Sequence, residues 1–198
     1  MHSAHIFHHH PVMTAIWVAT YVVWVAPEIV LGFRRPAMDA REEDRGSLPV
    51  VVGSIYLGVA LAFLAVTAAP SFTVGARWKV MFFLGLALWY GGMALRWYSI
   101  RVLGRFFTTR VAIAKDQHVV EAGPYRWLRH PSYLGGLLAL FGLGMTLTNW
   151  LSAMLPVICL LAAYAYRIPL EEQALVRGLG PPYREYMRRT WRLVPFVY

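Results

Sequence analysis

Residues 123–147 read GPYRWLRHPSYLGGLLALFGLGMTL, a cluster of prolines, arginines, tyrosines and a histidine followed directly by an apolar run. Pro131 suits the first turn of a helix, because its φ is fixed near the helical value. The stretch therefore predicts a helix that begins at a polar surface and enters a membrane. The polar cluster at its start is either a basic anchor at the bilayer edge or a binding site.

The composition extends this membrane prediction to the whole chain. Of the 198 residues, 58% are hydrophobic and only 15% are charged, and the mean hydropathy is +0.48. Soluble domains average about 45–50% apolar and about 25% charged residues. Apolar segments are spread over nearly the entire sequence, which predicts a single integral membrane domain over residues 1–198. The one cysteine, Cys159, lies in an apolar run, where we expect it to pack in the core rather than to form a disulfide.

Five apolar stretches are long enough, or nearly long enough, to cross the membrane, which takes about 20 helical residues. Residues 1–98 hold three of these spans, and residues 99–198 hold two more that are joined only through Asn149 and form a helical hairpin. Small residues in the hairpin permit close helix contact. The expected fold is all-α and multi-pass. The predicted spans are 12–33, 48–69, 78–98, 131–148 and 150–166, and the hairpin glycines are Gly135, Gly136, Gly142 and Gly144.

The basic residues predict how the chain is oriented. Of the 19 lysines and arginines, only Arg77 and Lys79 lie on one side of the five-span arrangement. The other 17 lie on the opposite side, among them Arg34 and Arg35 in the first loop and Arg96 at the border of the third span. Cytoplasmic loops carry the excess of positive charge, so the N-terminus is expected outside and the C-terminus in the cytoplasm. The net charge of +9 is then explained without nucleic acid. The compact form favours a bacterial plasma membrane, and residues 99–133 and 167–198 are expected to meet at its cytoplasmic surface.

The loop before the fourth span offers groups that bind ligands. Tyr125, Trp127 and Tyr133 present aromatic faces for an adenine or a sulfonium cation. The backbone N–H groups of Ser132 and Tyr133 are expected to be free at the helix start, where they can receive a carboxylate or a phosphate. Residues 106–113, FFTTRVAI, are predicted to form a short extended or interfacial piece.

A second polar set follows the fifth span. Arg167 lies where that span leaves the membrane, and Pro169 is expected to break or restart the helix. Glu171 comes within reach of Arg167 if helical geometry resumes. Ionisable residues at this depth tend to be functional, with a purely structural Arg167–Glu171 pair as the alternative. Glu172 is expected to cap the helix. The residues expected to contact anionic lipid headgroups are Arg184, Arg188, Arg189 and Arg192.

Taken together, HVVEAGPYRWLRHPSYLGG at 118–136 and RIPLEEQAL at 167–175 resemble the isoprenylcysteine carboxyl methyltransferase family, which is related to the phospholipid N-methyltransferases. The resemblance covers residues 96–198. It implies an integral membrane enzyme that uses S-adenosyl-L-methionine to methylate the carboxylate of a prenylated cysteine, with Arg167 and Glu171 as the catalytic, substrate-contacting pair. The positions that match the family's cofactor site are His118, Val119, Val120, Glu121, Tyr125, His130, Pro131, Ser132 and Tyr133.

The chemistry implied by this resemblance is consistent with the residues. A carboxylate acceptor is already ionised at neutral pH, so in-line methyl transfer requires mainly positioning. Arg167 is expected to orient the acceptor carboxylate bidentately, and the lipid tail is expected to enter sideways between helices. Two positions depart from the family pattern. Val111 replaces a cofactor-contacting glutamine, leaving only a backbone contact, and Leu179–Gly180 replaces the usual FG.

Other functions stay open at this point. A phospholipid N-methyltransferase would need to deprotonate an ammonium group, and Glu171 is the candidate base. An NADPH-dependent sterol-type reductase generally has an acid where this chain has Gly136. A transporter or scaffold is disfavoured because no span centre carries an ionisable residue except Glu28, which lies near the end of the first span. The N-terminal histidines suggest either a metal site or a mobile tail, and because no cysteine or acid ligand lies nearby we assign no metal. These histidines are His2, His5, His8, His9 and His10. No heptad seam or soluble interaction domain predicts an oligomeric state.

Overall fold

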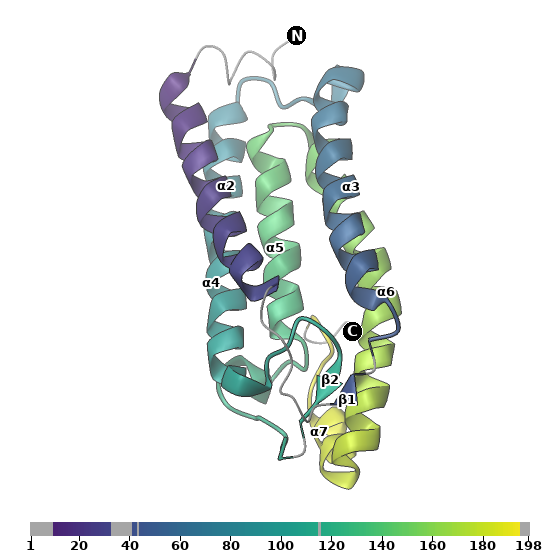
Figure 1. Cartoon of the computed structure of the whole chain (residues 1–198). Helices are drawn as coiled ribbons and strands as arrows, with labels where there is room; N and C mark the ends of the chain where they lie inside the picture. Colours follow the sequence, from purple (N-terminus) through teal and green to yellow (C-terminus); the bar gives the residue numbers. More distant parts are fainter. Residues whose placement is uncertain (1–9, 33–40, 43, 115, 195–198) are drawn as a thin grey trace.

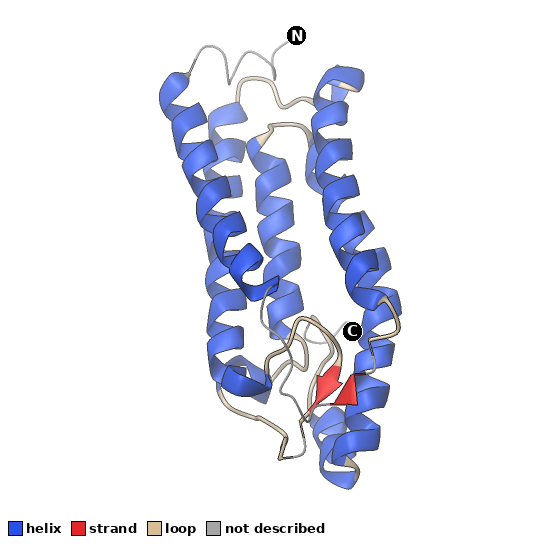
Figure 2. Ribbon diagram, in the orientation of Figure 1, coloured by secondary structure: helices blue, strands red, loops and turns tan. Residues whose placement is uncertain are grey.

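The computed structural model describes residues 10–32, 41–42, 44–114 and 116–194, which form a bundle of long helices (Figure 1). An antiparallel two-stranded sheet and three short 3-10 turns lie in the connections, with the sheet at one end of the bundle (Figure 2). The fold is therefore all-α and multi-pass, as predicted. The helices are α2 (Pro11–Gly32), α3 (Ser47–Ala68), α4 (Trp78–Leu103), α5 (Pro131–Thr146), α6 (Trp150–Leu179) and α7 (Pro181–Arg189), the strands are β1 (Arg41–Glu42) and β2 (Ala112–Ile113), and the 3-10 turns are η1 (Pro70–Phe72), η2 (Gly104–Phe106) and η3 (Gly123–Arg126).

The long helices match the predicted spans, with two of them longer than expected. Helices α2, α3, α4 and α6 are long and apolar enough to cross a membrane, and α5 is a shorter apolar helix. Helix α4 continues to Leu103 and α6 to Leu179. The 30 residues of α6 span about 45 Å, so this helix extends beyond the hydrocarbon.

The predicted break at Pro169 is wrong, because α6 runs through both Pro156 and Pro169. A proline in a membrane helix is tolerated when neighbouring groups hold the chain in place. Here Arg167 and Glu172, on either side of Pro169, are fixed by hydrogen bonds and ion pairs to other elements. Residues 167 and 171 therefore stay one helical turn apart.

Helices α4 and α5 approach each other most closely, and small residues make this possible. A Cβ at Gly92 would lie 2.4 Å from the Ala139 amide nitrogen, and one at Gly142 would lie 2.4 Å from the Trp89 amide nitrogen. Side chains at these points would force the helices apart. The predicted hairpin of α5 and α6 is also confirmed. Its turn is closed by Asn149, whose side-chain oxygen accepts hydrogen bonds from the first amides of α6.

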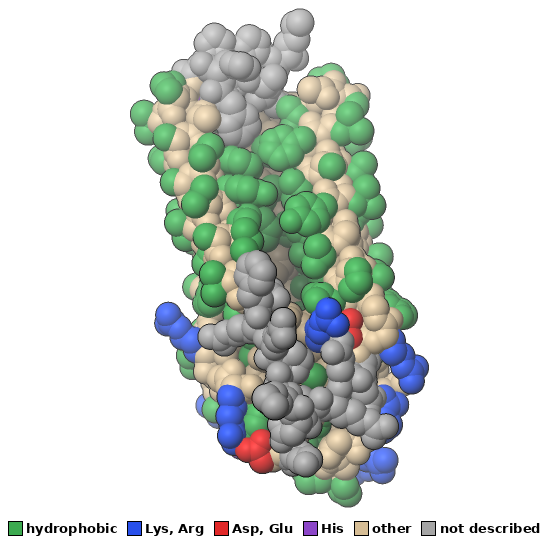
Figure 3. All heavy atoms as spheres, in the orientation of Figure 1, with side chains coloured by type: hydrophobic (Ala, Val, Ile, Leu, Met, Phe, Trp, Pro, Cys, Tyr) green, Lys and Arg blue, Asp and Glu red, His purple; other side chains and the backbone are tan. Residues whose placement is uncertain are grey.

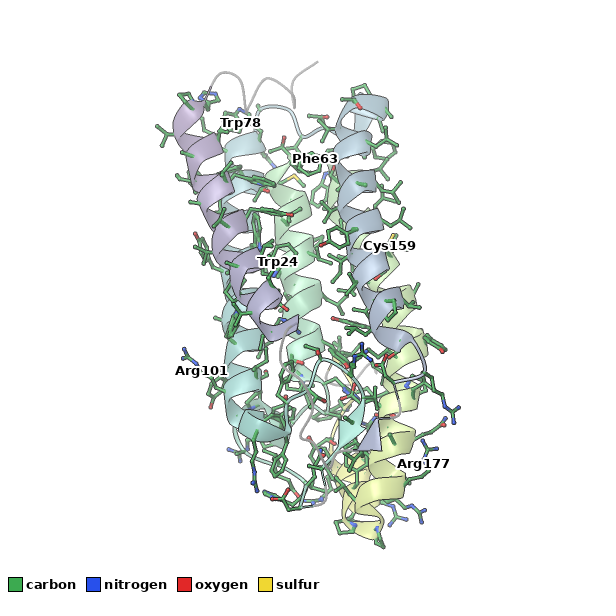
Figure 4. The ribbon with its side chains drawn as sticks, in the orientation of Figure 1. Trp24, Phe63, Trp78, Arg101, Cys159 and Arg177 are labelled. Carbon is green, nitrogen blue, oxygen red and sulfur yellow. The ribbon has the colours of Figure 1, made fainter. Side chains whose placement is uncertain are left out.

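Helix α2 is attached differently, through long side chains. The Trp17 indole N–H donates to Thr146 Oγ1 at 2.8 Å, and the hydroxyls of Thr20 and Tyr90 lie 2.8 Å apart. Trp24, which is labelled in Figure 4, packs edge-on against the buried Trp89 ring. These contacts bridge α2 to α4 and α5 without close approach of the helix backbones.

Most of the polar connections lie at one end of the bundle, which we call the basic end and define by residues 44–46, 104–130 and 177–194. Arg101 and Arg177 lie toward this end and Trp78 at the opposite one (Figure 4). The two polar segments of the sequence meet here as predicted, since the Arg129 amide donates to the Trp191 carbonyl at 2.7 Å. The predictions that concern His2, His5, His8, His9, Arg34 and Arg35 fall outside the described residues.

Candidate functional site

One cavity of about 410 Å³ runs from the space between α2 and α3 to the basic end. Ligand sites have volumes of about 300–1,000 Å³. We call the part between the two helices the apolar groove; its walls are formed by side chains such as Tyr21, Trp24, Val52, Ile55 and Val59. Figure 3 shows apolar side chains along both sides of this hollow. The other part, which we call the polar chamber, is lined by residues of 106–133, α6 and α7.

The structure brings most of the predicted site residues together around the polar chamber. Glu121 and Pro131 are the two that do not line it. Glu121 is exposed and accepts a hydrogen bond from Arg189 Nη2 at 3.1 Å, and Pro131 is buried in the first turn of α5. Trp127, predicted as a ligand-binding face, is 55% exposed and pairs with Arg126 instead. The residues that line the cavity are His118, Val119, Val120, Tyr125, His130, Ser132, Tyr133, Arg167 and Glu171.

Arg167 is buried at the junction of the groove and the chamber, and most of its N–H groups are engaged. Its Nη1 donates to Asp44 Oδ1 at 3.1 Å and to Ser47 Oγ at 2.8 Å, and its Nη2 donates to the Thr109 carbonyl at 2.6 Å. A guanidinium has four terminal N–H groups, so these contacts leave one for a ligand. The bidentate clamp expected from the sequence is therefore not available in this arrangement.

Tyr133 joins the two predicted catalytic residues. Arg167 Nε donates to the Tyr133 hydroxyl at 2.8 Å, and that hydroxyl donates to Glu171 Oε2. The predicted proximity of Arg167 and Glu171 is thus confirmed, with the tyrosine between them. The rings of His130, Tyr133 and Tyr164 stack in a row, with centroids 5.2 Å and 4.5 Å apart. This stack fixes the position of the Tyr133 ring on the wall of the chamber.

Glu172 was expected to cap a helix. It does not, because it lies inside α6 rather than at one of its ends. It is 3% exposed and forms ion pairs with Arg129 Nε and Arg192 Nη2, both at 2.9 Å. Arg192, expected to contact lipid headgroups, is therefore engaged within the protein. His130 Nε2 lies 3.5 Å from the same carboxylate. Glu172 thereby joins the loop before α5 to the C-terminal segment.

One expectation about the start of α5 is revised. The Tyr133 N–H is not free, because it donates to the His130 carbonyl at 3.1 Å. Tyr125 supplies a neutral aromatic wall nearby, since burial and the negative charge of Glu171 raise the pKa of its hydroxyl. The chamber therefore offers aromatic surface and side-chain charge, rather than a bare helix N-terminus, to a ligand.

Asp44 and Arg96 contact the site but were not among the predicted site residues. Burial raises the pKa of Asp44, but hydrogen bonds from Leu48, Ser47 and Val111 and the charge of Arg167 outweigh it and hold the pKa below its usual value. Arg96, counted in the sequence only as an orientation charge, forms a two-point ion pair with Glu28 at 2.5 Å and 2.8 Å on the cavity wall. An aspartate shortly before an apolar run indicates a helix start, although the residue directly before α3 is Gly46.

Comparisons with known proteins agree with this geometry. The sequence profile of the isoprenylcysteine carboxyl methyltransferase family matches residues 83–177, a range that contains all the predicted site residues. The protein-S-isoprenylcysteine O-methyltransferase B of Arabidopsis thaliana is 37% identical over 57% of this chain and 58% of its own length. A probable protein-S-isoprenylcysteine O-methyltransferase of Oryza sativa subsp. indica is 28% identical over 92% of this chain and 95% of its own.

A solved structure agrees as well. It is described as the eukaryotic intramembrane Ras methyltransferase ICMT, and it superposes with a TM-score of 0.62 at 25% identity, covering 75% of this chain and 53% of that one. Over residues 83–177, just under half of its length, the chain is similar to the isoprenylcysteine carboxyl methyltransferase family. It spans about three fifths of the length of the first Arabidopsis relatives that it matches. These relatives are eukaryotic, so they give no support to a bacterial source.

The structure shows what remains of the expected contact at Val111, one of the two positions that depart from the pattern of the similar family. The Val111 N–H donates to Asp44 Oδ1 at 3.2 Å. The backbone contact expected there in place of the family's glutamine is therefore limited to the carbonyl. The comparisons favour neither the phospholipid N-methyltransferase nor the sterol-type reductase.

Proposed function

We propose that this protein transfers a methyl group from S-adenosyl-L-methionine to the carboxylate of a lipidic acceptor of the isoprenylcysteine type. One observation carries the proposal. A single cavity joins an apolar groove between α2 and α3 to a polar chamber, and Arg167 and Glu171 line it where the two parts meet. A reaction between a water-soluble donor and a lipid-anchored acceptor needs this combination. The relatives named as protein-S-isoprenylcysteine O-methyltransferases support the same chemistry.

The polar chamber has the side chains that the donor requires. When bound, S-adenosylmethionine supplies an electrophilic methyl group on a positively charged sulfur. The Glu171 carboxylate and the aromatic rings of Tyr125 and Tyr133 line the chamber and suit such a cation. Arg129, also on the wall, suits the carboxylate of an amino acid. His118 and Val119 would complete the cofactor site, as the resemblance implies.

The acceptor would lie with its tail in the apolar groove and its carboxylate at Arg167. The remaining terminal N–H of Arg167 would hold one carboxylate oxygen and leave the other free to attack. No general base is required, because the carboxylate is already ionised at neutral pH. Arg167, Tyr133 and Glu171 then act mainly by holding the two reactants in line, and positioning of this kind lowers barriers by several kcal/mol.

The basic end would face the cytoplasm, in keeping with the positive-inside rule. On the face seen in Figure 3 the lysine and arginine side chains gather toward this end. The donor would then reach the polar chamber from the cytoplasm, and the acceptor would reach the groove from the lipid. Membrane lipids and a prenylated protein or small molecule are the expected partners.

The test is transfer of a labelled methyl group from S-adenosylmethionine by the purified protein in lipid. The acceptors are a farnesylated cysteine with a free carboxylate, the same compound as its methyl ester, and phosphatidylethanolamine. We expect a base-labile label in the free acid only, because an ester releases methanol in base. Label that is base-stable and confined to phosphatidylethanolamine would establish amine methylation instead. Absence of label in every acceptor would overturn the proposal.

A further inference from the structure

Asp44 stands just before α3, outside the range matched by the family profile, yet its carboxylate is as buried as the site itself. Its exposed fraction is 5%. The carboxylate accepts four hydrogen bonds from three separate parts of the chain, namely the start of α3, the segment at residue 111, and α6. A buried carboxylate with four donors is fully satisfied and held in a single orientation.

The two oxygens of Asp44 have different partners. Oδ2 accepts from the Leu48 amide at 3.1 Å, which is an ordinary contact at the start of a helix. Oδ1 accepts from Ser47 Oγ at 2.8 Å, from the Val111 amide at 3.2 Å and from Arg167 Nη1 at 3.1 Å. Capping α3 needs one oxygen and no charge, so it does not account for the contacts of Oδ1.

Those contacts determine the orientation of the Arg167 guanidinium. Arg167 Nη1 donates to Asp44 Oδ1 and also to Ser47 Oγ at 2.8 Å, and Ser47 Oγ in turn donates to Asp44. Both Nη1 hydrogens of the guanidinium are therefore engaged. The opposite edge then directs Nε to the Tyr133 hydroxyl at 2.8 Å. A buried guanidinium that lost its charge partner would seek other acceptors. Glu171, which already accepts from Tyr133, is the nearest carboxylate in this chain of contacts.

We infer that Asp44 is a positioning residue for methyl transfer, which fixes the guanidinium of Arg167 against Tyr133 without touching either reactant. This inference rests on the proposed function, because Arg167 is there the group that orients the acceptor. It also assigns a role in the reaction to the segment before α3, in the half of the chain that the family profile does not cover.

The variant Asp44→Asn separates positioning from capping. Its side-chain oxygen still accepts from Leu48, but the charge that faces Arg167 is lost. Hydrogen bonds to charged groups contribute about 1.5–3 kcal/mol, so we expect kcat to fall about tenfold or more. The KM values for donor and acceptor should stay within about threefold. The melting temperature in detergent should fall, because a buried guanidinium loses its charge partner, so kcat is measured on the folded fraction. Glu185→Gln, which removes a carboxylate from an exposed ion pair on α7, is the matched control and should leave kcat unchanged.

Unchanged kcat in Asp44→Asn would overturn the inference, and so would a loss of melting temperature with normal kcat in the folded fraction. If Asp44→Asn does not fold, Ser47→Ala takes its place. It removes the hydroxyl that bonds both the Asp44 carboxylate and the Arg167 guanidinium but leaves both charges in place, so kcat should fall about threefold or more. An unchanged kcat would contradict the inference. Wild-type protein that methylates none of the acceptors would show that the proposed function itself, and with it this inference, is wrong.

Discussion

The two halves of the bundle are built in different ways. Helices α4 and α5 pack backbone against backbone, and α6 packs against α5 through the hairpin and against α3. Helices α2 and α3 are covered far less by the protein, because 17% of the most apolar window is buried in each, against 39% in α4 and 44% in α6. Helix α2 is held by side-chain bridges such as Trp17 to Thr146 and Glu28 to Arg96.

This difference separates two requirements of the proposed reaction. The closely packed half carries Tyr133, Arg167 and Glu171, and close packing allows few alternative side-chain positions. Helices α2 and α3, which the protein covers less, leave the apolar groove open between them. A lipid tail would lie in this groove. We therefore expect changes in the first half to affect folding strongly, and changes in the second to affect stability less and acceptor binding more.

The largest effect should follow from Gly92→Ala in α4. The new Cβ would lie 2.4 Å from the Ala139 amide nitrogen and would push α5 away. Overpacking costs about 1–3 kcal/mol and sometimes more, and a backbone neighbour cannot move as a side chain can. We expect a loss of about 3 kcal/mol in unfolding free energy in mixed micelles. The adjacent Gly91→Ala is the control, since no atom lies within 4 Å of its Cβ. Equal stability of the two variants would contradict the packing of α4 on α5.

A smaller loss should follow from Glu28→Ala in α2. It leaves Arg96 without its ion-pair partner on the cavity wall, and the two side chains are 28% and 17% exposed. Breaking a fully buried pair costs about 3–5 kcal/mol, and the partial exposure reduces this to about 2 kcal/mol. The double variant Glu28→Leu with Arg96→Met should recover most of the loss in unfolding free energy. A double variant as unstable as Glu28→Ala would show that the pair's charge is not what matters.

The smallest effect is expected for Tyr90→Phe, which removes the hydrogen bond between Tyr90 and Thr20. Hydrogen bonds between membrane helices contribute about 0.6 kcal/mol on average. The same change at Tyr56, whose side chain is 70% exposed, should alter the unfolding free energy by less than this. A loss of several kcal/mol in Tyr90→Phe would mean that α2 depends on single bridges more than its arrangement suggests.

The sequence predicted the spans well because apolar length and glycine placement are local signals. The hairpin at Asn149, for example, follows from two apolar runs with one polar residue between them. The continuity of α6 could not be predicted, because the effect of Pro169 depends on contacts of Arg167 and Glu172 with distant elements. The pairing of β1 with β2 is equally non-local, since it joins residues 41–42 to 112–113.

The candidate site was predicted where a motif brings residues close in the chain, as at His130 and Tyr133. Asp44 was missed because its partner Arg167 is 123 positions away and nothing in its neighbours indicates that contact. Arg96 was assigned to orientation for a similar reason, since its partner Glu28 lies on another helix. The limited freedom of Arg167 could not be predicted either, because it depends on contacts from α3, α5 and the segment at Thr109.

The most direct test of the account compares two tryptophan variants in α3. Val52 lines the cavity and Val50 does not, and the two are similarly exposed at 42% and 46%. If the groove holds the acceptor tail and the polar chamber holds the donor, Val52→Trp should raise the acceptor KM about tenfold or more, the equivalent of losing roughly 1.4 kcal/mol of binding. It should leave the Kd for S-adenosylmethionine unchanged, and Val50→Trp should change neither value. An unchanged acceptor KM in Val52→Trp, or an equal loss of donor binding, would contradict the account.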